Sequence, residues 1–394
     1  MTRPDDVQPD WDPTSPEVLQ DQSAAYDAMR ERCPVAYNDR MGWTLFRHAD
    51  VIRALHDHET FSNAVSQHLN VPSGMDPPQH TAYRRIIEPY FSGARMSAFE
   101  PACRAIASGL LKEALALREL EIMQGLALPF AVQCQCAFLG WPEALHGQLV
   151  SWMRRNQEAT LKNDRQATSA VAQEFTAIVD EQIEARLQSG TGPDTDVTAS
   201  LMDEMVQGRP LTKDEIASVL RNWTAGEIGT LASSIGILAA FLAEHSEIQE
   251  RLRNQPGTIP AAVEEILRIR GPLVSNRRIT TKPVEIGGRK IEAGVRVSLN
   301  WIAANRDEDA FENASAFCLD RDREQSLLWG AGIHICPGAP LAQLELRVFL
   351  EELLARTTEI CFLRGKAPEN AVYPASGFAT VPLCLVPGTG SKAG

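Results

Sequence analysis

The chain has 394 residues, a formal net charge of −13 and a hydrophobic share of 44%. This composition indicates a globular protein and excludes disordered and fibrous chains. The length allows one large domain or two ordinary ones. The negative charge opposes binding to nucleic-acid phosphates and to anionic lipid, so neither nucleic acid nor a membrane is an expected partner.

Membrane spans and disulfides are also not expected. No stretch approaches the roughly 18 consecutive apolar residues of a span, and the N-terminal segment is acidic and proline-rich. We therefore expect a cytoplasmic protein. The eight cysteines are scattered, and most should be reduced and buried. Cys134 and Cys136 lie two apart, but no second Cys or His pair lies nearby to complete a metal clip.

The first half of the chain places a small β region before a helical mass. Hydrophobic spacing predicts, in chain order, a helix over 21–32, strands over 35–37 and 43–46, and a helix over 49–56. From residue 94 to 206 apolar residues recur mostly at helical spacing, with breaks at 140–142 and 190–196.

The second half combines long helices with short strands. Spacing and turn residues predict helices over 214–245, from Pro260 to Gly271-Pro272 and over 339–356, with strands over 284–286, 290–291 and 295–299. The helix over 214–245 would span about 45 Å and cross a whole domain. No repeat or interdomain linker is evident. We expect one mainly α domain over residues 1–394, with flexible tails at 1–15 and 387–394.

The segment Trp329-Gly-Ala-Gly-Ile-His-Ile-Cys-Pro-Gly338, just before a predicted helix, carries the clearest chemical signal. Its glycines let the backbone turn tightly and approach a flat macrocycle. Cys336 would lie where the loop enters the helix, and amide N–H groups there stabilise a thiolate. A thiolate ligand donates electron density to haem iron and promotes O–O cleavage. The alternative is a glycine-rich turn with a buried free cysteine.

This segment resembles the ligand signature of the cytochrome P450 superfamily, with Trp329 in place of the usual phenylalanine. The resemblance covers almost the whole chain and implies the cytochrome P450 fold, a large helical domain with a small β-sheet region. Glu265-Ile-Leu-Arg268 matches the family's E-x-x-R motif, with both charges on one helix face. Arg321 follows as the third member of a buried Glu-Arg-Arg network.

Further residues resemble the family's contacts to the haem propionates. His80 and Arg84 lie four apart on one helix face, as in the helix that grips the haem. Arg278 resembles the arginine that reaches a propionate from the sheet, although Arg277 is adjacent. His334 would be a cationic or hydrogen-bonding propionate partner. A solvated His/Arg pair is the alternative for the first two residues.

The long helix departs from the family pattern A-G-x-acid-Thr, whose acid and alcohol deliver protons to iron-bound oxygen. This chain reads Ala225-Gly226-Glu227-Ile228-Gly229-Thr230, so Ile228 and Gly229 occupy the acid and alcohol positions. Glu227 and Thr230 lie one residue to either side and are the candidate catalytic residues. The glycines would permit a local bulge that brings one of them to the oxygen. A water-only relay is an alternative.

The resemblance implies a haem-thiolate monooxygenase that uses haem b (heme b, iron protoporphyrin IX), with Cys336 as the metal ligand. It would activate O2 and hydroxylate, or oxidatively dealkylate, a small hydrophobic substrate. A peroxide-dependent peroxygenase would tolerate loss of the acid–alcohol pair. Desaturation, ring coupling and a haem-thiolate binding or sensing protein also remain open.

Substrate and partners follow from the same resemblance. Five residues are the candidate pocket wall: Val71, Ala225, Ile228, Val274 and Phe378. An apolar stripe would equally suit an ordinary core. No charged anchor for a carboxylate or amine is evident. Because no flavin, iron–sulfur or nicotinamide motif appears, a ferredoxin and a ferredoxin reductase are the expected electron donors. We expect a monomer.

Overall fold

The computed structural model describes residues 7–66, 68–162, 164–194 and 196–388. Its α-helices in chain order are α1 (Pro16–Gln20), α2 (Gln22–Arg32), α3 (His48–His56), α4 (Gln79–Ile87), α5 (Gly93–Leu117), α6 (Leu128–Leu139), α7 (His146–Leu161), α8 (Arg165–Ser189), α9 (Val197–Met202), α10 (Lys213–Glu244), α11 (Ser246–Asn254), α12 (Ile259–Ile269), α13 (Trp301–Asn305) and α14 (Ala339–Arg356). Shorter helical turns are η1 (Glu88–Phe91), η2 (Met123–Ala127), η3 (Glu143–Leu145), η4 (Pro256–Thr258) and η5 (Gly332–His334).

The strands in chain order are β1 (Val35–Asn38), β2 (Gly42–Leu45), β3 (Phe61–Ser62), β4 (Glu119–Glu121), β5 (Met205–Val206), β6 (Arg209–Pro210), β7 (Ser275–Thr280), β8 (Val284–Ile286), β9 (Arg289–Ile291), β10 (Arg296–Asn300), β11 (Thr357–Phe362), β12 (Glu369–Asn370), β13 (Phe378–Thr380) and β14 (Pro382–Pro387). The prediction of a mainly α domain with a small sheet region is confirmed.

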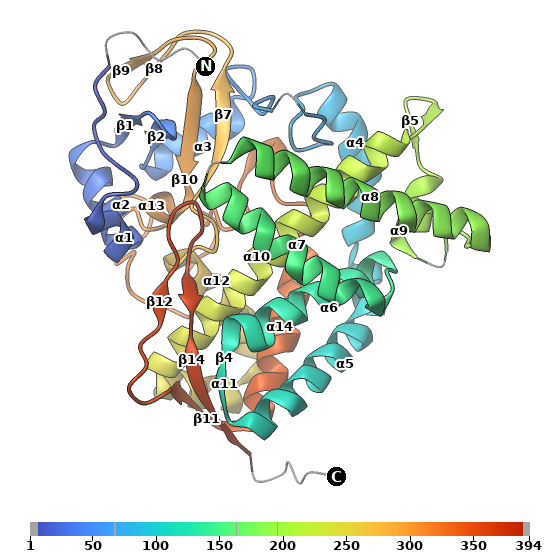
Figure 1. Cartoon of the computed structure of the whole chain (residues 1–394). Coiled ribbons are helices and arrows are strands. Elements are labelled where there is room, and N and C mark those ends of the chain that lie inside the picture. Colours follow the sequence, from blue (N-terminus) through green and yellow to red (C-terminus); the bar gives the residue numbers. More distant parts are fainter. Residues whose placement is uncertain (1–6, 67, 163, 195, 389–394) are drawn as a thin grey trace.

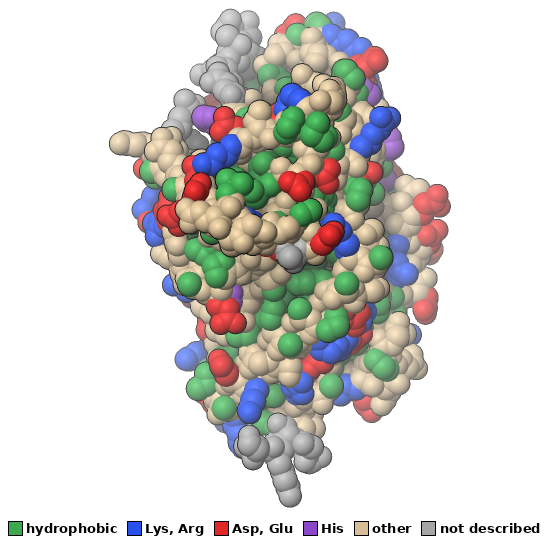
Figure 2. Space-filling view, turned by 90° about the vertical axis from the view of Figure 1, so that its right-hand side faces the viewer, with side chains coloured by type: hydrophobic (Ala, Val, Ile, Leu, Met, Phe, Trp, Pro, Cys, Tyr) green, Lys and Arg blue, Asp and Glu red, His purple; other side chains and the backbone are tan. Residues whose placement is uncertain are grey.

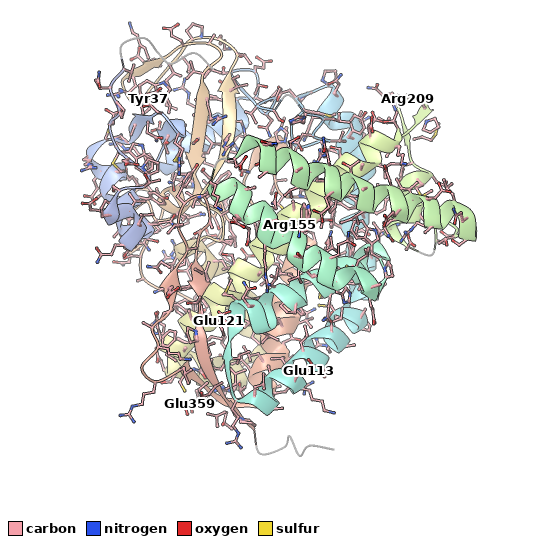
Figure 3. All side chains as sticks on the ribbon, viewed as in Figure 1. Tyr37, Glu113, Glu121, Arg155, Arg209 and Glu359 are labelled. Carbon is pink, nitrogen blue, oxygen red and sulfur yellow. The ribbon has the colours of Figure 1, made fainter. Side chains whose placement is uncertain are left out.

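Helix α10 forms the axis of the helical body and runs diagonally through it (Figure 1). It contacts α6, α8, α12 and α14, which lie on different sides of it. Its N-terminus is fixed by a capping box, because the Thr212 side chain accepts from the Glu215 N–H and Glu215 accepts from the Thr212 N–H. Arg209, labelled on the β5–β6 hairpin in Figure 3, donates to Glu215 as well. The start of α10 is therefore tied to that hairpin.

The length and apolar composition of α10 would also suit a membrane span, although polar residues interrupt its apolar ones. Two-thirds of its most apolar stretch, 67%, is buried inside the protein. A core helix of a globular protein has these properties because its apolar residues pack against neighbouring helices on several sides. The burial of α10 thus accounts for its composition without a membrane.

The β region packs beside the helices as a five-stranded sheet of order β1-β2-β10-β7-β3. β10 pairs parallel to β2 and antiparallel to β7. A second sheet of order β11-β14-β4 lies at the opposite end of the molecule (Figure 1). In it the C-terminal strand β14 joins two segments that are far apart in the sequence.

The expected flexible tails are wrong for the parts of them that the structure describes. Trp11 is buried against Tyr26 and Phe46, and Asp10 accepts a hydrogen bond from the Tyr37 N–H at 2.7 Å. At the other end Pro387 belongs to β14, and the Gly388 N–H donates to Arg356 O at 2.8 Å. Residues 1–6 and 389–394 lie outside the described residues.

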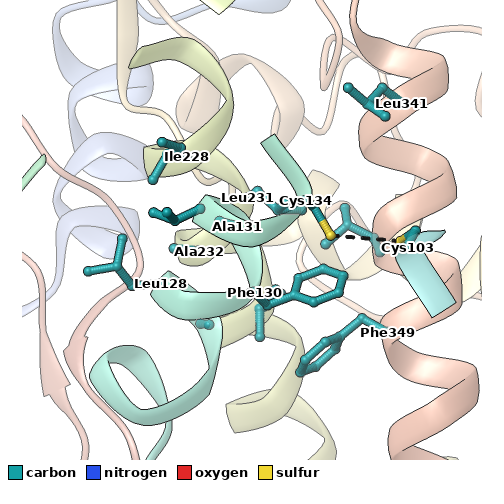
Figure 4. Close-up of a cluster of buried hydrophobic side chains, with 14 of the residues drawn as sticks. Cys103, Leu128, Phe130, Ala131, Cys134, Ile228, Leu231, Ala232, Leu341 and Phe349 are labelled. Carbon is teal, nitrogen blue, oxygen red and sulfur yellow. Dashed lines mark hydrogen bonds between the residues drawn. The ribbon is translucent and has the colours of Figure 1, made fainter. Parts of the chain in front are cut away.

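The main hydrophobic core gathers around α5, α6, α10 and α14. Figure 4 shows part of it, where Phe130 faces Phe349 and Cys103 faces Cys134. On the outside, acidic and basic side chains are interspersed with apolar ones over the face shown in Figure 2. That mixture agrees with a protein whose charge is spread over its surface.

Candidate active site

The cysteine loop reaches α14 through tight turns that require glycine. Gly332 has a φ of +68°, and a Cβ placed on it would lie 2.5 Å from Leu55 O. A side chain at this position would clash with the backbone in the last turn of α3. The Cys336 N–H donates to Trp329 O at 2.8 Å and closes the loop. This hydrogen bond and the glycine turn fix the position of the thiol at the start of α14.

The thiol of Cys336 lies in a mixed electrostatic environment. Burial raises its pKa to about 11, and the Glu227 carboxylate adds to the rise. The Gly338 and Ala339 N–H groups and the Arg84 guanidinium act in the opposite direction. Without a cation the sulfur is therefore a thiol at neutral pH. A bound metal ion would deprotonate it and be held as a thiolate complex.

Two histidines come together beside the loop. His80 of α4 and His334 of the loop have ring centroids 4.2 Å apart. Among the described residues, neither buried Nε2 atom has a hydrogen-bond partner. Burial and the Arg84 charge lower the pKa of His80 to about 4. Burial, followed by the neighbouring cationic groups, lowers that of His334 to about 3. Both imidazole rings are therefore neutral at pH 7 when no anion is bound. Their unpartnered Nε2 atoms could each form a hydrogen bond with a bound anion.

Two arginines complete this cluster. Arg84 donates to Ile335 O at 2.8 Å and to Glu88 at 3.0 Å. Arg278 is buried, whereas the adjacent Arg277 is exposed, so Arg278 is the inward-facing residue of the two. Burial lowers the pKa of Arg278 to about 10, and Asp76 offsets part of this effect. Both guanidinium groups act on His334 electrostatically. The structure thus brings the neutral His80 and His334 together with the charged Arg84 and Arg278, and we call these four residues the cationic cluster because of the two guanidinium groups.

The same region leaves room for a flat group between α10 and the loop. A Cβ on Gly226 or on Gly229 would meet no atom within 4 Å. A Cβ on Gly338 would lie 3.9 Å from both Cys336 Sγ and Glu227 Oε2, so the loop and α10 border one space. A haem fits this site, because its iron would face the cysteine and its two propionates would meet the unsatisfied donors of the cationic cluster.

Glu227 lies against a second acid that the sequence interpretation missed. Its carboxyl interacts electrostatically with that of Glu345 on α14, and neither Glu345 oxygen nor Glu227 Oε1 has a hydrogen-bond partner among the described residues. Both carboxyls are buried, and burial raises the pKa of each, that of Glu345 to well above its usual range. Two neighbouring buried carboxyls resist ionising together, so the pair favours holding a proton. The sequence feature that indicates a buried acid here is Glu345 itself, because it lies among the mostly apolar residues Leu344 to Phe349 of a predicted helix.

Thr230 is held within α10. Its hydroxyl donates to Gly226 O at 2.6 Å and lies 3.3 Å from Glu227 O. α10 is α-helical from Lys213 to Glu244, so the local bulge expected at the glycines is absent there. Back-bonding of a threonine to the residue four positions earlier bends a helix slightly without opening it. Thr230 is thus half-buried on the helix face that also carries Gly226.

The expected structural network is assembled in the structure. Glu265 and Arg268 are each 1% exposed and pair at 2.8 Å. Arg321 reaches Glu265 at 2.8 Å, and the Cys318 N–H donates to the same carboxylate. A buried ion pair of this kind is retained when every polar atom finds a partner. The network ties α12 to the segment that leads into the cysteine loop.

Four of the five candidate pocket residues lie in or pack against the main core, and Val274 lies in another cluster. Val71 and Ile228 are fully buried in the main core, where Figure 4 shows Ile228 with Leu231 and Ala232. Val274 is fully buried in a different cluster, with Trp11 and Tyr26. Ala225 and Phe378 are partly exposed. Leu273, next to Val274, is 37% exposed.

Comparison with known proteins agrees with this geometry. Residues 144–358 match the family model described as Cytochrome P450. Erythromycin C-12 hydroxylase of Saccharopolyspora erythraea is 34% identical over 86% of this chain and 88% of its own length. Cyclomarin C epoxidase CymV of Salinispora arenicola is 32% identical over 81% of this chain and 84% of its own.

Solved structures show the same relationship. The open cytochrome P450 EryK of S. erythraea is 31% identical and superposes with a TM-score of 0.85, covering 95% of this chain and 99% of that one. Both the sequence matches and the structural likeness extend well beyond the cysteine loop. The chain therefore belongs to the cytochrome P450 family of haem-thiolate monooxygenases.

Proposed function

We propose that this chain binds haem b through Cys336 and uses O2 to hydroxylate, or oxidatively dealkylate, a small hydrophobic substrate. The observation that carries the proposal is the cationic cluster beside the cysteine, with its unsatisfied His80 and His334 nitrogens. His80, Arg84, Arg278 and His334 would hold the two propionates. Bound haem would supply the site that activates oxygen.

Glu227 and Thr230 are the proposed catalytic residues on the α10 side of the site. The buried contact between Glu227 and Glu345 keeps a proton in the carboxyl pair. The Thr230 hydroxyl donates to the helix backbone and retains lone pairs for a water molecule. A proton would thus move through ordered water between these residues instead of through a direct acid–alcohol pair.

Electrons would come from a separate ferredoxin and ferredoxin reductase, and the protein would work as a cytoplasmic monomer with one domain over residues 1–394. The partly exposed Ala225 and Phe378 are the pocket positions that this proposal retains. Val71 and Ile228 would shape the pocket from the main core behind it, and Val274 from the separate cluster that contains Trp11.

A peroxide-dependent oxygenation is the second candidate, because Ile228 and Gly229 occupy the positions of the usual acid and alcohol. Turnover of one substrate would be compared with NADH, ferredoxin and its reductase, and with hydrogen peroxide alone. We expect product from the ferredoxin system, with NADH consumed in proportion. Product from peroxide alone, with no coupled NADH consumption, would replace the monooxygenase by a peroxygenase. Ligand-dependent spectral change without product from either oxidant would indicate a sensor.

A further inference from the structure

Arg221 lies on the face of α10 that borders the haem site. It precedes Ala225 by one turn and Gly229 by two, and residues at this spacing share a helix face. Its Cα is about 6 Å along the axis from that of Ala225 and about 12 Å from that of Gly229. Arg221, Ala225 and Gly229 are all partly exposed, although α10 crosses the interior. This spacing places Arg221 at one end of the α10 face that borders the haem site, with its guanidinium beside the loop at 69–71.

The charge of Arg221 is not matched by a carboxylate among the described residues. Its recorded hydrogen bond goes from Nη2 to the backbone carbonyl of Leu69 at 2.8 Å. The nearest acids along α10 are engaged elsewhere, because Glu215 pairs with Arg209 and Glu227 with Glu345. Burial lowers the pKa of Arg221 with no offsetting negative charge.

Burial also lowers the pKa of two other arginines, but each of these has an acid nearby that offsets the effect. Arg253 donates to carbonyls at the end of α14, and Glu250 and Glu359 offset its burial. Arg278 belongs to the cationic cluster that suits the propionates and has Asp76 nearby. Of these three arginines, Arg221 alone has no offsetting acid, and it lies on α10, outside the cationic cluster.

Holding the loop at 69–71 does not require Arg221. Ser218 donates to Leu69 O at 3.1 Å and accepts from the Val71 N–H at 2.9 Å. Asn222 donates to Val71 O at 2.8 Å. These bonds fix the loop on α10, while Leu69 itself is 43% exposed. The guanidinium has five N–H donors in a fork that matches a carboxylate, and most of them have no partner in the described residues.

We propose that Arg221 binds the carboxylate of the substrate, which makes the substrate an amphiphilic acid with an apolar body directed along α10 toward Gly229. From the spacing along the helix, the oxidised carbon lies on the order of 10 Å from the carboxylate. This inference rests on the proposed function and narrows its substrate class. It also replaces the expectation that the pocket contains no charged anchor.

The test compares dodecanoic acid with methyl dodecanoate, two probes of similar shape that differ in charge. Binding to the haem-loaded protein would be measured by the spin-state change of the haem and by calorimetry. The variants are Arg221→Gln, Arg221→Lys and a matched control, Arg251→Gln, which removes one exposed charge from α11.

We expect Arg221→Gln to weaken binding of the acid at least tenfold while ester affinity stays within about twofold. Arg221→Lys should retain part of the affinity, and Arg251→Gln all of it. Equal acid affinity in wild type and Arg221→Gln, or a parallel loss of acid and ester binding, would overturn the proposal. Failure of the proposed function would be distinct, since the wild-type protein would then lack the carbon monoxide spectrum of a thiolate-ligated haem.

Discussion

Replacing Glu345 with Gln should make the protein relatively more stable at higher pH. In the wild type, the buried Glu227–Glu345 pair holds a proton because burial raises the pKa of Glu345 well above its ordinary 4.5. The unfolded chain releases that proton above pH 4.5. The folded state then binds more protons than the unfolded state, so the free energy of unfolding falls as pH rises. Glutamine can donate to Glu227 without holding a titratable proton.

The size of this effect follows from linkage. One extra bound proton changes the free energy of unfolding by about 1.4 kcal/mol per pH unit. Between the ordinary pKa of a glutamate and the raised pKa of Glu345, the advantage of Glu345→Gln over the wild type should therefore grow by about 1.4 kcal/mol with each pH unit. Glu227 remains in both proteins and largely cancels in the comparison. The advantage grows up to the raised pKa of Glu345, stays constant above it and is absent below the ordinary value.

The measurement is urea denaturation of both proteins at several pH values, followed by far-UV circular dichroism. Glu351→Gln is the matched control, because Glu351 lies on the same helix but pairs with Arg104 and Arg347. That variant should not gain stability with rising pH. If wild type and Glu345→Gln show the same pH dependence, the buried pair does not hold the proton and its proposed part in catalysis fails.

Two further changes test the surroundings of the site. Trp329→Phe removes the 2.9 Å hydrogen bond from Nε1 to Glu264 and should lower the free energy of unfolding by about 1 kcal/mol; unchanged urea denaturation would contradict this role for tryptophan. Hydrogen bonds from Arg347 and Arg104 hold the pKa of Glu100 at about 2, below its ordinary 4.5, so its stabilisation is present above pH 4.5 and lost as pH falls through 2. Glu100→Gln should cost about 1 kcal/mol at pH 7, and a difference that persists at pH 2 would refute the ion-pair explanation.

The long elements could be predicted because their sequence pattern repeats over many residues. The expected helix at 214–245 is α10 at Lys213–Glu244, and the helix at 339–356 is α14. The short strands β4 and β14 were not predicted, because their pairing depends on contacts between distant parts of the chain. Trp11 was assigned to a tail, since one aromatic residue among prolines gives no periodic signal.

The chemistry of the site was predicted less evenly. The spacing of the cysteine loop was sufficient to identify Cys336, because tight turns need glycine and a metal needs a suitable ligand. Arg221 and Glu345 were missed, since helical spacing shows that residues share a face but not what that face meets. Sequence spacing also does not show which core cluster a residue of a short extended segment joins, so it does not separate Val274 from the other pocket candidates.

The central claim is that Cys336 supplies a thiolate to haem iron. The most direct measurement is the absorption spectrum of the reduced, haem-loaded protein with carbon monoxide, recorded for the wild type and for Cys336→Ser. We predict the long-wavelength band of a thiolate-ligated haem in the wild type and its loss in Cys336→Ser. A wild-type spectrum without that band, or a band that survives in Cys336→Ser, would contradict the assignment.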